Sequence, residues 1–124
     1  LGRPDGQVLP QYSLKPVQEC LAGHLGRPVK FVDDCVGPEA ERRAAALKPG
    51  ELLLLENLRF HPAETVIDKA KENPSGKLTP AQEEQRQVFC RALAAHADLY
   101  VNDAFGTCHR KHVSILQGLL RTGA

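Results

Sequence analysis

The sequence lacks the features that would place it among membrane, disulfide-rich or nucleic-acid-binding proteins. Trp and Met are absent, and aromatic residues make up 5% of the 124 residues. The stacking platforms of a single-strand nucleic-acid binder are therefore not expected. The longest apolar run, Leu52 to Leu55, is far shorter than the roughly 20 residues of a membrane helix. The net charge of +1 indicates no general attraction to nucleic acid or to a membrane surface.

The four cysteines also give no strong signal. Cys20, Cys35, Cys90 and Cys108 are far apart, without a Cys-x-x-Cys pair, so neither a zinc site nor a disulfide framework is predicted. We expect reduced thiols and a cytoplasmic protein. The chain opens Leu-Gly-Arg-Pro-Asp-Gly without Met, which predicts further residues upstream.

What is present is an alternation of helices and strands. Gly and Pro in residues 1–12 predict a loop. Ser13 is then a candidate cap for a helix whose apolar residues recur at Leu14, Val17, Leu21 and Leu25. Gly26 and Pro28 predict the end of this helix. The following elements are a strand over 29–32, a helix from Gly37-Pro38 to Leu47, and a strand over 52–55.

The second half of the sequence continues the alternation. Residues 61–78 are polar and long for a loop, and a short helix is predicted over 63–72. Thr79-Pro80-Ala81-Gln82 predicts a capping box, opening a helix that reaches about Ala97 with Val88, Leu93 and Ala97 buried. A strand over 99–101 and a helix over 113–120 follow. This order predicts a three-layer α/β/α fold with a parallel, Rossmann-like sheet, here as one incomplete domain over 1–124.

Ligands of open α/β sheets bind beyond the carboxyl ends of the strands. Arg59 follows the strand over 52–55, and Arg110 follows the strand over 99–101. Arginines on one sheet edge would suit a phosphate or carboxylate, and the histidines at 61, 109 and 112 could add donors. The alternative for each Arg is a solvated surface residue, and from spacing alone the two interpretations are evenly balanced.

Other candidate sites are weaker. The Asp33-Asp34 pair could bind a metal, although a strand-end pair of this kind is more often a cap or a solvated turn. Cys108 beside His109 resembles a nucleophile and base, but adjacent loop residues rarely face each other. The sequence contains neither Gly-x-x-x-x-Gly-Lys nor Gly-x-Gly-x-x-Gly. We therefore assign no catalytic, metal or nucleotide site to these residues.

Several segments resemble phosphoglycerate kinase in order and spacing. They are Leu-Gly-Arg-Pro-Asp-Gly at residue 1, Tyr-Ser-Leu-Lys-Pro-Val at 12, Leu-Leu-Leu-Glu-Asn-Leu-Arg-Phe-His at 53, and Tyr-Val-Asn-Asp-Ala-Phe-Gly-Thr at 100 with His109-Arg110. The resemblance covers the chain except residues 62–80, which look longer than the family's loop. It implies part of the N-terminal, phosphoglycerate-binding domain.

The resemblance also implies an activity and site residues. The family transfers phosphate between 1,3-bisphosphoglycerate and ADP, giving 3-phosphoglycerate and ATP, with Mg²⁺ held mainly on a separate nucleotide domain. The positions that match its basic patch are Arg3, Arg59 and Arg110, with Leu1 and Gly2 as the backbone of the first turn. The family is typically monomeric and cytoplasmic, with no nucleic-acid or membrane partner. The chain alone is expected to be inactive, and the alternative is a non-catalytic binding or structural module of the same family.

Overall fold

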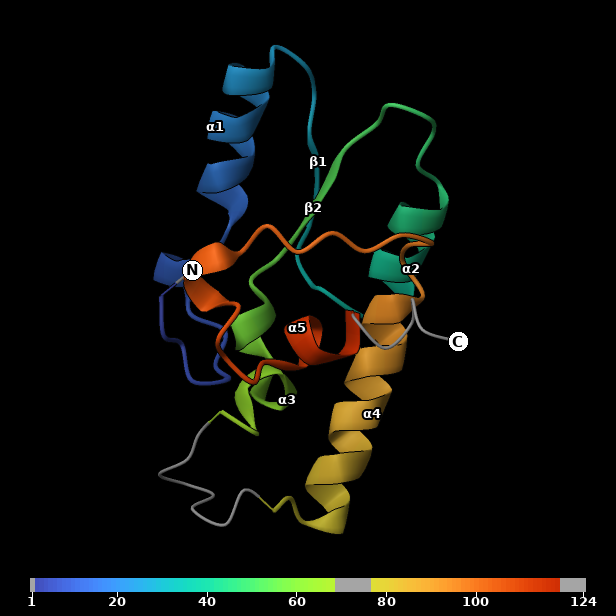
Figure 1. Ribbon diagram of the computed structural model, residues 1–124. Helices are drawn as coiled ribbons and strands as arrows, with labels where there is room; N and C mark the ends of the chain where they lie inside the picture. The colour runs from blue at the N-terminus through green and yellow to red at the C-terminus, as the bar shows by residue number, and fades with distance from the viewer. Residues whose placement is uncertain (1, 69–76, 119–124) are drawn as a thin grey trace. The chain divides into compact units, whose positions relative to one another are not determined.

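The computed structural model describes residues 2–68 and 77–118, which form two compact units, Leu1–Phe60 and His61–Ala124. Each is treated by itself below. The first unit holds α1 (Lys15–Leu25), β1 (Lys30–Val32), α2 (Pro38–Ala45) and β2 (Leu53–Leu55), with 3₁₀ turns η1 (Pro10–Tyr12) and η2 (Leu58–Phe60). The second holds α3 (Pro62–Thr65), α4 (Pro80–Ala94), η3 (Phe105–Thr107) and α5 (Val113–Gly118) (Figure 1).

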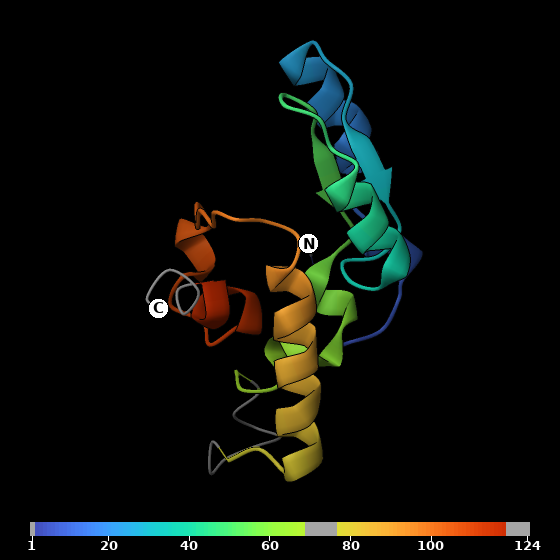
Figure 2. The same ribbon diagram turned by 90° about the vertical axis from the view of Figure 1, so that its right-hand side faces the viewer.

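The first unit has the predicted α/β fold with a parallel sheet. β1 and β2 pair in parallel, with Phe31 opposite Leu54, and α2 makes the crossover between them. α1 and α2 lie on opposite sides of the strands (Figures 1 and 2), which gives the helix, sheet and helix layers. Residues from these elements and the loops beside them form the buried apolar core: Val29, Val32, Cys35, Ala40 and Phe60.

The predicted C-terminal end of α1 is confirmed, whereas the predicted N-cap is wrong. Gly26 caps the helix in the left-handed conformation, with a φ of 61°, which a residue without Cβ adopts at little cost. Ser13 lies one residue further out than expected, because Leu14 is the N-cap residue. The predicted apolar face is not buried, and Val17 and Leu25 are 40% and 47% exposed. A two-stranded sheet offers too little surface to cover this face.

The capping box of α4 is confirmed. Thr79 Oγ1 accepts a hydrogen bond from the backbone N–H of Gln82, and the Gln82 side chain accepts one from the backbone N–H of Thr79. The predicted burial is wrong at Val88, which is 52% exposed, while its neighbour Phe89 is 5% exposed. Leu93 is half-buried, and Ala97 is exposed because α4 already ends at Ala94. Adjacent residues point about 100° apart around a helix, so one position decides which side chain is covered.

Two other predictions differ from the structure. Leu99–Val101 forms no strand, and Leu99 and Val101 are about three-quarters exposed (75% and 76%). A strand needs a neighbour for its N–H and C=O groups, and in the described part of the chain only β1 and β2 pair. The helix predicted over 63–72 is shorter, since α3 spans Pro62–Thr65. Residues 69–72 of that prediction lie outside the described residues.

In the residues that the structure describes, every helix is too short or too polar to cross a membrane. The longest, α4, has an acidic and a basic side chain paired across its first turns. Glu83 accepts hydrogen bonds from Arg86 and from Gln87 Nε2, and these lower the pKa of its carboxyl to about 2.

We expect the Arg86→Ala variant to raise the pKa of Glu83 from about 2 toward its ordinary value of 4.5, because the Arg86 contact is the largest cause of the shift. Gln87→Ala should raise it less. A depressed carboxyl pKa stabilises the helix above about pH 4.5, and this stabilisation is lost as the pH falls toward 2. NMR titration of the Glu83 side chain measures the pKa directly. A wild-type value near 4.5 would contradict the pairing.

Candidate functional site

Arg59 holds both ends of the turn formed by residues 2–6. It lies in η2, just after β2 and the polar pair Glu56-Asn57. Its Nη1 donates a hydrogen bond of 2.7 Å to the carbonyl of Gly2, and its own carbonyl accepts one of 3.1 Å from the N–H of Gly6. Residues 57 positions apart in sequence are thereby joined, so the strand-end Arg is coupled to the turn that carries Arg3.

The turn over residues 2–6 has a conformation that its sequence explains. Gly2 and Gly6 have φ values of 66° and 78°, in the region that favours glycine. A Cβ on Gly2 would lie 2.3 Å from Cδ1 of Tyr12, so the ring packs directly on the backbone. Within the turn, Pro4 is buried and Arg3 is exposed. Leu1, also predicted at this site, lies outside the described residues.

A buried carboxylate connects the end of β2 to the start of α1. Glu56 is 7% exposed. Its Oε2 accepts a hydrogen bond of 2.6 Å from Ser13 Oγ, and its Oε1 accepts one of 2.8 Å from the N–H of Leu14. The same Oε1 accepts the N–H of Asn57 at 2.7 Å. A carboxylate is well suited to this place because it offers several acceptor positions and charge-assisted bonds are strong.

Asn57 extends the connection to Arg59. It is 2% exposed, its Nδ2 donates to the carbonyl of Tyr12 at 3.0 Å, and its Oδ1 accepts the N–H of Arg59 at 3.1 Å. The backbone around Arg59 and Tyr12 is therefore fixed by one amide side chain. The sequence Glu-Asn-Leu-Arg-Phe thus combines a buried anchor with an arginine that is only half-buried.

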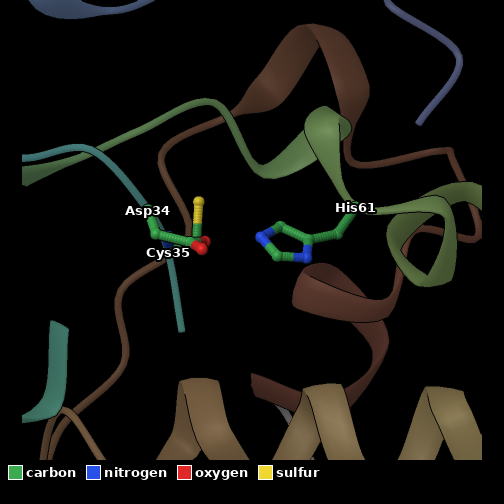
Figure 3. Close-up of side chains that lie close together, drawn as sticks. All are labelled: Asp34, Cys35 and His61. Atoms are coloured by element: carbon green, nitrogen blue, oxygen red, sulfur yellow. The ribbon is translucent and has the colours of Figure 1, made fainter. Parts of the chain in front are cut away.

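Asp34 and Cys35 follow β1 (Figure 3). Asp34 Oδ1 accepts hydrogen bonds from the N–H groups of Cys35 and Val36, at 2.6 and 3.4 Å, the pattern of a local Asx turn. This arrangement agrees with the turn interpretation of the Asp33-Asp34 pair. The thiol of Cys35 donates to the carbonyl of Glu56 at 2.7 Å, so the loops after β1 and β2 are joined.

Arg110 lies in the second unit, after η3. The backbone N–H of Arg110 donates a hydrogen bond of 2.8 Å to the carbonyl of Thr107. Its side-chain Nη1 lies 3.2 Å from Oδ2 of Asp68. The Arg110 side chain is 44% exposed. Because residues 99–101 form no strand, the strand-end argument for Arg110 does not apply in this structure. Its convergence with Arg3 and Arg59 stays a prediction.

The three histidines have different surroundings. His61 packs against Phe89, with ring centroids 4.9 Å apart. His112 is buried, with Nδ1 3.8 Å from Glu64 Oε1 and Nε2 3.7 Å from Asp68 Oδ2, while His109 is exposed. The Cys108 thiol donates to the carbonyl of Phe105 at 3.0 Å.

A second buried carboxylate organises this unit. Glu64 of α3 is 2% exposed and accepts hydrogen bonds from the N–H and the hydroxyl of Ser114. Ser114 lies in the first turn of α5, where backbone N–H groups lack partners within the helix. Burial, followed by the negative charge of Glu64, raises the pKa of Tyr100. Neither Glu64 nor Asp68 had a sequence signal, because their partners are 42 to 50 residues away.

The fold and the Arg59-held turn define an α/β protein in which polar residues gather after the ends of parallel strands. A family model described as phosphoglycerate kinase matches residues 1–120. The chain is 52% identical over 116 residues to a phosphoglycerate kinase of Yarrowia lipolytica, and 47% identical over 116 residues to one of Schizosaccharomyces pombe. It is 53% identical over 114 residues to one of Moorella thermoacetica.

These matches cover 94%, 94% and 92% of the chain, but 27%, 27% and 24% of the relatives. The chain belongs to the phosphoglycerate kinase family. It spans about a quarter of the length of these relatives.

Proposed function

We propose that this chain supplies part of the phosphoglycerate site in the N-terminal domain of a phosphoglycerate kinase. The observation that carries the proposal is the hydrogen bond from Arg59 to the carbonyl of Gly2. This bond joins Arg59 to the turn that carries Arg3, and both are among the three arginines predicted for the site. The enzyme would transfer phosphate between 1,3-bisphosphoglycerate and ADP in the cytoplasm, typically as a monomer, without nucleic-acid or membrane partners.

The role of Arg59 follows from its chemistry. A guanidinium has five N–H donors in a planar fork, and its Nη1 is engaged with Gly2. The remaining donors can bind a phosphate or carboxylate oxygen with charge-assisted hydrogen bonds. The bond to Gly2 also restrains the guanidinium before ligand arrives, which reduces the entropy lost on binding. Arg3 is exposed on the restrained turn and would provide a second cation.

The residues after β1 and β2 do not fit a nucleotide or magnesium site. The carboxylate of Glu56 is buried and bonded to Ser13, Leu14 and Asn57, and Asp34 Oδ1 accepts backbone N–H groups. The sequence also has no glycine-rich phosphate loop of the common types. We therefore propose that Mg²⁺ and ATP or ADP bind elsewhere in the enzyme, and we assign no step through them to these residues.

We expect 3-phosphoglycerate to bind the chain, and the variants Arg59→Ala and Arg110→Ala each to weaken binding by about 1.5–3 kcal/mol, or roughly 10- to 150-fold. Isothermal titration calorimetry at fixed ionic strength measures the effect. Arg59→Lys should fall between wild type and Arg59→Ala, since it keeps the charge and loses the fork. Arg27→Ala is the matched control, an exposed arginine outside the proposed site. Equal binding by all variants would contradict the proposal.

Activity distinguishes the enzyme from a non-catalytic module of the same family. The informative protein is a hybrid in which the part of the chain matched over 116 residues replaces the corresponding segment of the Yarrowia lipolytica phosphoglycerate kinase. We expect the hybrid to phosphorylate 3-phosphoglycerate and to lose most of this activity with Arg59→Ala. The 124 residues alone should be inactive, because phosphoryl transfer needs nucleotide and metal positioned against the acceptor. A folded, inactive hybrid would favour the module.

A further inference from the structure

Three consecutive residues of the second unit face the carboxylate of Asp68. Arg110 Nη1 lies 3.2 Å from Asp68 Oδ2, and the backbone N–H of Lys111 donates to Asp68 Oδ1 at 3.3 Å. The buried imidazole of His112 places Nε2 3.7 Å from Asp68 Oδ2. A guanidinium, a backbone N–H and an imidazole thus converge on one carboxylate that lies more than 40 residues earlier in the chain.

This donor set is suited to an oxyanion from outside the chain. Arginine and backbone N–H groups are the usual ligands of phosphate and carboxylate oxygens. Both hydrogen bonds to Asp68 are at or beyond the long end of the normal range. The side chains of Arg110 and Asp68 are 44% and 22% exposed, and ion pairs at such places are weak. An anion from outside the chain can therefore compete with the Asp68 carboxylate for these donors.

We propose that Asp68 is an internal competitor for an anion site formed by Arg110, Lys111 and His112, and that an oxyanion of the ligand displaces it. The proposal rests on the proposed function, in which Arg110 binds a phosphorylated acid. Asp68 would then lower the affinity of the site and favour ligands with enough charge to replace a carboxylate.

The sign of the effect on anion binding distinguishes a competitor from a residue that merely positions Arg110. A positioning residue needs to hold the guanidinium only, whereas Asp68 also accepts a hydrogen bond from the backbone N–H of Lys111. The backbone of Arg110 is already held by its bond to the carbonyl of Thr107. The two roles predict opposite signs, because removing a competitor strengthens anion binding and removing a positioning residue weakens it.

The test is an NMR titration of the chain with inorganic phosphate, following the Lys111 amide signal at fixed ionic strength. We expect Asp68→Asn to bind phosphate about fivefold more tightly than wild type, the ratio that corresponds to a weak surface ion pair. Asp68→Ser serves as a second variant should the amide disturb the fold. The matched control is Asp98→Asn, which removes the same charge from an exposed position of this unit and should change binding less than twofold.

Arg110→Ala, alone and combined with Asp68→Asn, completes the design. Tighter binding by Asp68→Asn that is lost on adding Arg110→Ala supports the proposal. Unchanged or weaker binding by Asp68→Asn overturns it and leaves the role of Arg110 intact. An equal gain in Asp98→Asn overturns it in favour of a general charge effect. If Arg110→Ala has no effect in either background, the assignment of Arg110 under the proposed function fails, and this proposal with it.

Discussion

Replacing Glu56 by alanine is expected to lower the free energy of unfolding of the first unit by about 3 kcal/mol. The substitution leaves the N–H groups of Leu14 and Asn57 and the hydroxyl of Ser13 without the acceptor that they share. It also opens a cavity where the carboxylate was buried. Denaturant unfolding gives the free energy, and hydrogen exchange at the amide of Leu14 reports the local loss of protection.

Two variants control this experiment. Glu56→Gln keeps one acceptor oxygen and the side-chain shape, so its loss should be smaller, about 1 kcal/mol. Glu19→Ala removes an exposed carboxylate from α1 and should change stability by no more than about 0.5 kcal/mol. If Glu56→Ala were as stable as Glu19→Ala, the network around Glu56 would contribute nothing to the fold.

Replacing Glu64 by alanine is expected to destabilise the second unit by a similar amount, about 3 kcal/mol. Glu64 is 2% exposed and accepts both the N–H and the hydroxyl of Ser114 at the start of α5. Its loss leaves these donors unpaired and removes a negative charge from a helix N-terminus, where it is favourable. Hydrogen exchange at the amide of Ser114 and denaturant unfolding measure the effect.

Two further variants separate the contributions to the destabilisation expected for Glu64→Ala. Ser114→Ala removes the hydroxyl contact and keeps the bond from the N–H, so about 1 kcal/mol is expected. Glu84→Ala, at an exposed position of α4, is the control for loss of a carboxylate. Exchange at Leu14 in the first unit should not change in Glu64→Ala if the two units open separately. Faster exchange at Leu14 would show that they unfold together.

The parts of the fold that could be predicted from sequence depend on neighbours along the chain. The cap at Gly26 and the capping box at Thr79 are set by residues within one helical turn, and both are confirmed. β1 and β2 carry apolar residues between clear turn signals, and their pairing follows from the short crossover through α2. Phe89 was missed in favour of Val88 because burial depends on which face of α4 meets the rest of the unit.

The strand predicted over Leu99–Val101 is the clearest failure, because strand formation depends on residues far away in the sequence. Its composition is typical of a strand, but a strand exists only where another strand accepts its hydrogen bonds. The same limit applies to the site. Arg59 could be found from its position after β2, while its contact with Gly2 and the pairing of Arg110 with Asp68 depend on how distant loops meet.

The four cysteines differ in exposure, so their rates of alkylation report on the two units. Cys35 is 1% exposed, and its sulfur is bonded to the carbonyl of Glu56. An alkylating reagent therefore reaches it when the first unit opens. Cys90 of α4 is half-buried, and burial raises the pKa of its thiol, so it reacts slowly in the closed second unit. Cys20 and Cys108 are exposed and give the rate of unhindered modification. One labelling time course, read by mass, thus times the opening of the first unit against an internal standard and compares the reactivity of Cys90 with that of the exposed thiols.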